Sequence, residues 1–327
     1  MTGVYVCSLQ PCAGKTALAA GLARRWEGQK ASLGYLRLDV GAQANGDSLF
    51  LAKCTGAEVG PVVEANGSLR RAFETMARSK QAVIIEGEGN LTESSGVESC
   101  LHALESTGAK AVLVARYVPG LTAGALVGAA QKLSGHVAGV VVNAIPEAKW
   151  QWASTTLGPE LAKAGVPVLG LVPEVWRLSG ASVGEIAEAL GGEIVTCPEA
   201  ADEIVENLMV GAMSVDPAPH HLGRKTNKAV ITRSNRVDIQ LGALATHTVC
   251  FILCGPEYPT PDILIETQDR GIPIVRVEGK MVPAIEKLET LFGQVRFHQA
   301  KKLAIWEQVL SEHCDFAGLD KRLGLSA

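Results

Sequence analysis

Residues 4–26, VYVCSLQPCAGKTALAAGLARRW, decide the fold of this chain. The apolar run at 4–7 is rich in strand-forming residues, and a short loop follows it that ends in Gly14-Lys15-Thr16. The apolar residues after the loop recur every four positions and therefore share one face of a predicted helix: Leu18, Leu22 and Trp26. A strand, a loop and a helix in this order are the setting that a phosphate-binding loop needs.

The loop residues suit an anion. Backbone N–H groups of a helix N-terminus and of the loop before it point at one spot, where negative charge is favoured. Lys15 would add a cation at the β- and γ-phosphates, and the Thr16 hydroxyl would be a ligand of Mg²⁺. The other loop positions expected to contact a nucleotide are Ser8, Cys12, Ala13 and Gly14.

The motif departs from its usual form at one position. The usual pattern has a glycine six residues before the lysine, and Leu9 stands there in this chain. An ordinary turn between a strand and a helix is therefore the alternative interpretation of the segment. The strand before it and the amphipathic helix after it favour phosphate binding.

Length and composition narrow the class of protein. At 327 residues the chain is long enough for two domains, and its net charge of −4 does not suggest a nucleic-acid partner. No apolar run reaches the length of a membrane span, and the N-terminus enters a strand without an export signal. The eight cysteines are scattered, which indicates reduced thiols and a cytoplasmic location.

The first half of the chain alternates strands with helices, which predicts an α/β fold with a mostly parallel sheet flanked by helices. Ligands of such sheets bind beyond the carboxyl ends of the strands. Polar side chains are expected at four of these ends: Ser8, Glu86, Asn143 and Glu174. Glu86 is the candidate for a carboxylate beside Mg²⁺, and Asp47 could share the metal of Thr16, although a turn aspartate is favoured for it on sequence alone.

The second half predicts a smaller α/β domain that begins near 178–182, where the periodicity breaks. Residues 202–213 read as a helix, strands are expected at 228–232, 248–255 and 273–277, and an exposed helix at 300–313 closes the chain. A group of basic residues lies within this half: Arg224, Lys225, Lys228, Arg233 and Arg236. The group could bind an anionic nucleotide, but a solvated face is the favoured interpretation.

Several motifs carry a family resemblance. The segments VYVCSLQPCAGKTAL, GYLRL, GDSL, VIIEGEG, GVVVN and VLGLVPE, in this order, resemble the dethiobiotin-synthetase-like fold. They are most similar to the version found at the N-terminus of long phosphate acetyltransferases. Residues 205–290, with VGAMS, NKAVIT, VDIQLGAL and FILCGPEYPTPDIL, resemble the DRTGG domain that follows in those enzymes.

The resemblance implies a division of the chain and a set of ligands. It implies a nucleotide-binding domain over 1–180, a DRTGG-like domain over 181–297 and a C-terminal helix and tail over 298–327. In dethiobiotin synthetase the residues that match Lys15 and Thr16 bind ATP and Mg²⁺, and those that match Asp47 and Glu86 lie on the metal side. The residue that matches Asn143 contacts adenine. The enzyme has a lysine for its substrate where Arg37 stands here, and arginine cannot do the pKa-dependent work of lysine.

Three functions follow in order of preference. The first is a regulatory or sensor protein that binds ATP with Mg²⁺, is at most a weak ATPase and lacks the acetyl-transferring domain. A phosphate acetyltransferase or other acyltransferase acting in trans is its implied partner, and a homodimer is compatible with two α/β domains and an exposed C-terminal helix. The second is an ATP-dependent ligase of the dethiobiotin synthetase type, which Arg37 disfavours. The third is a scaffold whose loop holds no nucleotide, which Leu9 motivates.

Overall fold

The computed structural model of the protein describes residues 2–38, 50–51, 54–63, 67–214, 218–293, 297 and 299–325. The chain forms two compact units. The first unit contains Met1–Glu174 together with Phe297–Ala327, and the second contains Val175–Arg296. The second unit is therefore an insertion in the sequence of the first.

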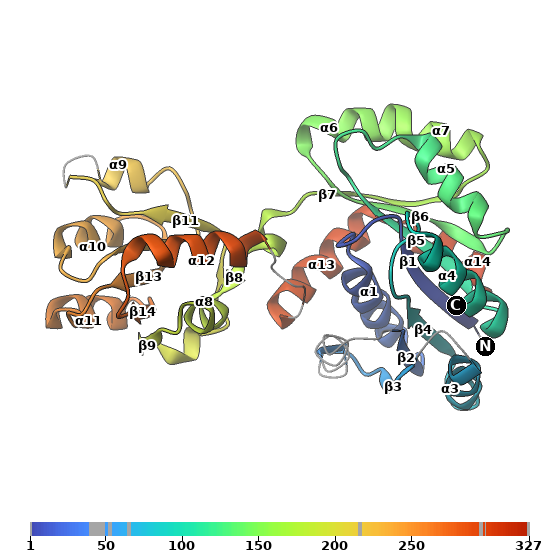
Figure 1. The fold of residues 1–327 in the computed structure, drawn as a ribbon, viewed down its shortest axis with the longest axis horizontal. Coiled ribbons are helices and arrows are strands. Elements are labelled where there is room, and N and C mark those ends of the chain that lie inside the picture. Colours follow the sequence, from blue (N-terminus) through green and yellow to red (C-terminus); the bar gives the residue numbers. More distant parts are fainter. Residues whose placement is uncertain are drawn as a thin grey trace. The chain divides into compact units, whose positions relative to one another are not determined.

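A sheet of seven parallel strands is the centre of the first unit, in the order β3-β2-β4-β1-β5-β6-β7 (Figure 1). The strands are β1 (Thr2–Ser8), β2 (Leu33–Leu38), β3 (Glu58–Val63), β4 (Ala82–Glu86), β5 (Lys110–Arg116), β6 (Val137–Ile145) and β7 (Val168–Pro173). The predicted mostly parallel α/β fold is confirmed. The central strand β1 lies between β4 and β5, so the chain leaves it in one direction first and later returns to its other side.

Helices cover both faces of this sheet. They are α1 (Lys15–Gly28), α3 (Gly67–Ala77), α4 (Ser94–Thr107), α5 (Ala123–Lys132), α6 (Glu147–Trp152), the π-helical turn η1 (Ala153–Leu157), α7 (Gly158–Lys163), α13 (Ala300–His313) and α14 (Phe316–Leu323). One face packs against α3, α4, α5 and α7 through a continuous apolar core. The other face packs against α1, with α13 and α14 beside it. Among the helices described, none is long and apolar enough to cross a membrane.

Side chains alternate between these two faces along each strand. Tyr5 and Cys7 of β1 belong to the core on the side of α4 and α5, whereas Val4, Val6 and Ser8 point to the side of α1. The same alternation places Glu86 of β4 on the side of α1, opposite to Ile85. The polar ends of the central strands thus face the beginning of α1.

The C-terminal segment is buried, and the expectation of an exposed helix at 300–313 is wrong. Leu303, Trp306 and Leu310 of α13 are buried, and the Trp306 indole N–H donates to the Ala17 carbonyl of α1 at 2.6 Å. α14 adds Asp320, whose carboxylate accepts from the Trp26 indole at 3.0 Å. The bounds of α13 were predicted correctly. Its burial was not, because it depends on packing against α1 at the start of the chain.

The second unit has its own sheet of five strands, in the order β11-β12-β13-β14-β9, in which only β9 is antiparallel to its neighbour. Its strands are β8 (Ala181–Ser182), β9 (Glu193–Thr196), β10 (Ile204–Val205), β11 (Asn207–Val210), β12 (Lys228–Arg233), β13 (Thr248–Cys254) and β14 (Ile274–Val277). The short strands β8 and β10 pair with each other. Its helices are η2 (Trp176–Ser179), α8 (Val183–Leu190), η3 (Pro198–Ala200), α9 (Ala218–Leu222), α10 (Val237–Leu244), α11 (Pro261–Asp269) and α12 (Met281–Gly293).

Two separate apolar cores hold these elements together. α8 and α12 cover one face of the five-stranded sheet, and α9, α10 and α11 cover the other. The helix predicted at 202–213 is wrong, because this segment forms β10 and β11. Its apolar residues satisfy a helical spacing, but pairing of β10 with β8 and of β11 with β12 decides the conformation.

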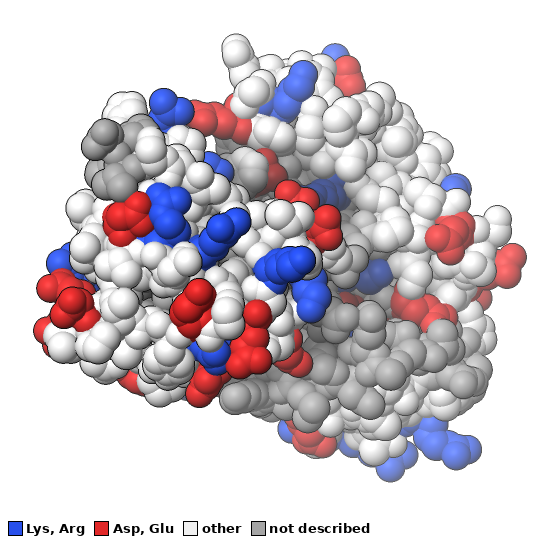
Figure 2. All heavy atoms as spheres, turned by 60° about the vertical axis from the view of Figure 1, so that its left-hand side comes forward, with Lys and Arg blue, Asp and Glu red and all other residues white. Residues whose placement is uncertain are grey.

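The basic group predicted in the second half does not form one solvated face. Lys228, the first residue of β12, is buried, and the guanidinium of Arg236 contacts the carboxylate of Asp238 at 2.8 Å. On the face drawn in Figure 2, lysine and arginine side chains lie among aspartates and glutamates rather than in one basic area. This face of the molecule therefore has mixed charge.

We expect Lys228→Met to stabilise the protein by about 1–3 kcal/mol, because the buried ammonium has no hydrogen-bond partner among the residues that the structure describes. Burial also lowers the pKa of Lys228 from its usual value of 10.5. Wild-type stability should then rise relative to the variant between that lowered pKa and pH 10.5, where the unfolded chain binds more protons. Urea unfolding at several pH values measures this difference, and a variant less stable than wild type would contradict the expectation.

Candidate functional site

The loop between β1 and α1 turns sharply at two residues. Cys12 and Gly14 have left-handed backbone angles, with φ of 53° and 103°. Left-handed residues alternating with ordinary ones turn successive N–H groups toward a common point. Gly14 is also the N-cap of α1 and offers no side chain to the first N–H groups of the helix. This end of α1 is therefore suited to an anion.

Asn143 of β6 supports this loop from the side. Its amide nitrogen donates to the Ala13 carbonyl at 3.1 Å, and its amide oxygen accepts from the Ala144 N–H at 2.8 Å. A Cβ on Gly14 would lie 2.6 Å from the Asn143 nitrogen. Glycine is thus required at position 14 by both its φ angle and this close approach. The strand that carries Asn143 continues to Ile145, beyond the end predicted from the sequence.

Lys15 reaches across the site from the start of α1. Its ammonium donates to the Gly89 carbonyl at 2.6 Å and to the Ser8 hydroxyl at 3.3 Å. Ser8 is the last residue of β1, and Gly89 follows β4, so the lysine joins the carboxyl ends of the two strands. A cation at this point lies where the ends of the central parallel strands meet, which is the usual ligand position in such sheets.

Glu86 is the centre of a buried polar group next to Lys15. Its Oε1 accepts from the Thr16 hydroxyl at 2.6 Å and from the Arg37 guanidinium at 3.1 Å. Its Oε2 accepts from the Tyr35 hydroxyl at 2.7 Å. Burial, and then the neighbouring carboxylate, raise the pKa of the Tyr35 phenol well above its usual range. Tyr35 therefore remains a donor over the ordinary pH range and fixes the carboxylate.

Thr16 and Glu86 were predicted to lie at one site, whereas no role was predicted for Tyr35. The signal was present in the alternation of β2, because Tyr35 and Arg37 lie two residues apart and so share one face. The register of β2 against β4 then places this face beside Glu86, since Arg37 pairs directly with Glu86 across the two strands. That register cannot be obtained from the sequence of one strand alone.

Two predicted site residues remain, Asp47 and Glu174. Asp47 lies outside the residues that the structure describes. Glu174 follows β7, which is three strands away from β1 and therefore about 14 Å across the sheet. Its backbone N–H donates to the Ile145 carbonyl at 2.9 Å. Cys12 is exposed in the loop and Ala13 is buried under it.

Leu9, which departs from the loop motif, extends the edge of β1 that pairs with β5. The Leu9 N–H donates to the Val114 carbonyl at 2.9 Å, so Leu9 continues the pairing of β1 with β5 by one residue. Its side chain packs partly against the core under α4 and α5. The loop thus begins after Leu9 and is shorter than the usual motif. Lys15 and Thr16 keep their positions at the helix N-terminus.

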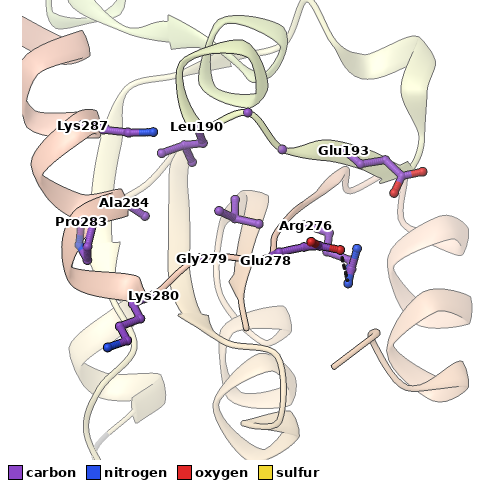
Figure 3. A pocket seen from close by; sticks show the side chains of 12 residues that line it. Leu190, Glu193, Arg276, Glu278, Gly279, Lys280, Pro283, Ala284 and Lys287 are labelled. Atoms are coloured by element: carbon purple, nitrogen blue, oxygen red, sulfur yellow. Dashed lines mark hydrogen bonds and ion pairs between the residues drawn. The ribbon is translucent and has the colours of Figure 1, made fainter. Parts of the chain in front are cut away.

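The second unit contains a cavity of about 410 Å³. It lies between the end of α8, β14 and the start of α12 (Figure 3). Figure 3 shows Lys287 directed toward Leu190 across the cavity, with Arg276 and Glu278 joined to each other on the opposite side. Its lining mixes basic, acidic and apolar side chains.

Comparison with known families concerns this second unit. Residues 185–291 match the model of the DRTGG domain. The second unit contains a DRTGG domain. The matched residues extend from α8 to α12 and include the cavity between them. The DRTGG resemblance stated from the sequence is therefore confirmed, whereas a dethiobiotin-synthetase-like identity of the first unit stays a prediction.

Three solved structures are similar to parts of the chain. The regulatory CBS and DRTGG region of a Clostridium perfringens pyrophosphatase, complexed with diadenosine tetraphosphate, is 16% identical, with 35% of this chain and 48% of that chain covered and a TM-score of 0.31. Chloroplast FtsY from Physcomitrella patens is 17% identical, with 52% and 57% covered and a TM-score of 0.38. FtsY from Thermotoga maritima is 20% identical, with 53% and 62% covered and a TM-score of 0.38. The match thus spans less than two thirds of each of these chains.

Proposed function

We propose that the protein is a nucleotide-binding regulatory protein, with the nucleotide phosphates held at the N-terminus of α1. The observation that carries the proposal is the convergence of Lys15, Thr16 and Glu86 at the ends of β1 and β4. A cation and the N–H groups of a glycine-turned loop attract phosphate, and the neighbouring carboxylate orients the threonine hydroxyl. We further propose ATP as the nucleotide.

Within this group, the Thr16 hydroxyl is the side chain best suited to bind Mg²⁺ directly. The Thr16 hydroxyl gives its hydrogen to Glu86, which leaves its lone pairs available to a metal ion. Mg²⁺ keeps several water ligands and needs few protein oxygens. Thr16 would therefore hold the ion directly, with Asp47 and Glu86 as the proposed carboxylates beside it. The ion would offset negative charge on the bound phosphates.

The regulatory part of the proposal rests on the contacts of α1 within the first unit. Ala17, in the first turn of α1, accepts the Trp306 indole N–H of α13. The ring of Trp306 also contacts that of Phe297 at 6.2 Å between centroids, and Phe297 is the first residue after the second unit in the chain. A change at the start of α1 on nucleotide binding would thus reach the connection to the DRTGG domain.

The finer features of the proposal rest on the family resemblance. We propose that the first unit is dethiobiotin-synthetase-like and related to the N-terminal part of phosphate acetyltransferases. The partner would then be an acyltransferase acting in trans, in the cytoplasm, with a homodimer as the assembly to test first. Arg37 at the position of a substrate lysine makes a sensor the better proposal than a ligase.

Thermal melting with and without ATP and Mg²⁺ tests the proposed function. A ligand at a hundred times its dissociation constant adds about 2.7 kcal/mol to the native state, which corresponds to roughly 5–10 °C for a unit of this size. We expect that shift for wild type and none for Lys15→Ala. Lys110→Ala is the matched control, because Lys110 is an exposed lysine at the opposite, amino end of β5. A shift of equal size in Lys15→Ala would refute the proposed site.

A further inference from the structure

The cavity of the DRTGG domain lies at the carboxyl end of a parallel strand. β14 ends at Val277, and the next three residues, 278–280, line the cavity before α12 begins. The carboxyl ends of parallel strands are the usual ligand positions in α/β sheets. The volume of about 410 Å³ is in the range of pockets that hold small organic ligands. Position and size therefore both suit a small molecule.

One stripe of α12, together with the residue before it, lines this cavity. The stripe has the spacing i, i+3, i+4 and i+7 that one helix face requires, and its members are Lys280, Pro283, Ala284 and Lys287. The two lysines are about 10 Å apart along the helix axis, because each residue adds about 1.5 Å. Only uncharged side chains of the stripe lie between them. The stripe therefore presents two cations with a neutral gap, which suits an elongated anion.

Neither ammonium group of this stripe is neutralised within the part of the chain that the structure describes. Lys280 and Lys287 are exposed, and their ammonium groups have no ion pair or hydrogen bond with a described residue. The acidic side chains of the lining do not approach them. Glu278 is paired with Arg276 at 3.2 Å, and Figure 3 shows the Glu193 carboxylate directed away from α12. Both lysines are therefore available to an anion.

The place of Lys280 at the start of α12 is electrostatically unfavourable in the absence of an anion. Its carbonyl accepts from the Ala284 N–H at 3.4 Å, so Lys280 directly precedes the first turn of the helix. The N-terminus of a helix carries partial positive charge, which repels a lysine there. The first turn of α12 contains no acidic residue to offset this repulsion. An anion at this end of the cavity would be attracted by the ammonium group and by the helix together.

We propose that this cavity binds the phosphate chain of a polyphosphate compound between Lys280 and Lys287. Charged hydrogen bonds from the two ammonium groups would hold the chain at both ends. The apolar side chains of Leu190 and Val277 line the same cavity and would lie beside the body of a ligand that carries the phosphates. This site is separate from the one proposed at α1, and the inference does not rest on that proposed function.

Isothermal titration calorimetry of the full chain with inorganic tripolyphosphate tests this site. The parent protein and all variants carry Lys15→Ala, which removes the lysine of the other proposed site. We expect tripolyphosphate to bind the parent. Lys280→Gln and Lys287→Gln should each raise its dissociation constant about 5- to 20-fold, because each removes a charged hydrogen bond. Both positions are exposed, so the substitutions should leave the fold intact.

Lys225→Gln is the matched control, because Lys225 is an exposed lysine of the same domain that does not line the cavity. Its dissociation constant should stay within about twofold of that of the parent, since a distant surface charge is screened by salt. Equal losses in all three glutamine variants would show unspecific attraction by surface charge and would overturn the inference. No binding of tripolyphosphate would also overturn it, and neither result bears on the site at Lys15.

Two further ligands identify what the cavity recognises. Inorganic phosphate cannot occupy both ends of the stripe and should bind at least about tenfold more weakly than tripolyphosphate. Equal binding of the two would overturn the inference of an elongated ligand. ATP that binds as tightly as tripolyphosphate, or more tightly, identifies a nucleotide as the source of the phosphate chain. Weaker binding of ATP identifies the free polyphosphate chain.

Discussion

Trp306→Ala is expected to lower the free energy of unfolding of the first unit by about 3–5 kcal/mol. Trp306 is 2% exposed, and its ring lies between α1 and Phe297. Truncation to alanine removes the buried ring and leaves a cavity between α13 and α1. It also removes the N–H donor from the Ala17 carbonyl, where the donor lies at 2.6 Å.

Urea unfolding followed by far-ultraviolet circular dichroism measures the loss. Trp176→Ala is the matched control, since Trp176 is 70% exposed and its removal should change stability by less than about 0.5 kcal/mol. Trp306→Phe keeps most of the packing and loses the donor, so we expect an intermediate value. A Trp306→Ala variant within 1 kcal/mol of wild type would contradict the packing of α13 on α1.

Gly96→Ala should be strongly destabilising although alanine is the better helix former. A Cβ on Gly96, in the first turn of α4, would lie 2.0 Å from the Asn90 carbonyl oxygen and 3.0 Å from the Asn90 nitrogen. These are backbone atoms and cannot rotate away, so the loop after β4 must shift. We expect a loss of about 1–3 kcal/mol or more, together with displacement of the Gly89 carbonyl that contacts Lys15.

Gly128→Ala, which also lies in a helix, is expected to change stability in the opposite direction to Gly96→Ala. Gly128 lies within α5, and apart from its chain neighbours and the nearby backbone of α5, no described atom lies within 4 Å of the Cβ that alanine would add. The substitution should stabilise the protein by about 0.5–1 kcal/mol through the lower entropy of the unfolded chain. Thermal melting of both variants, with and without ATP, measures the difference. Equal effects of the two substitutions would show that the contact with Asn90 is relieved at little cost.

Much of the first unit could be predicted because its elements follow strong local patterns. The run at 82–86 is uniformly apolar up to Glu86, and the spacing of Leu18, Leu22 and Trp26 suits one helix face. β3 was missed because it is an edge strand that contains Gly60 and Pro61, residues that weaken a strand pattern. α4 was missed because its first residues, Ser-Ser-Gly, are characteristic of a turn.

Part of the candidate site could also be predicted, not from local patterns but from the general geometry of parallel sheets. The carboxyl ends of parallel strands meet at one edge, so Lys15, Thr16 and Glu86 could be expected near one another. The contact of Asn143 with Ala13 and that of Arg37 with Glu86 depend on strand order and register, which pairwise contacts decide. Burial of α13 likewise depends on a helix almost 300 positions earlier in the chain, since Trp306 and Ala17 are 289 residues apart.

The return of the chain at Phe297 also constrains the order in which the protein can fold during its synthesis. The ribosome completes the seven strands of the first sheet before it makes the DRTGG domain, and it makes α13 and α14 only afterwards. At ordinary elongation rates this delay is on the order of ten seconds. During that time the apolar side of α1 lacks the helices that later cover it, so the nascent first unit must wait for a domain of another fold before its core is complete.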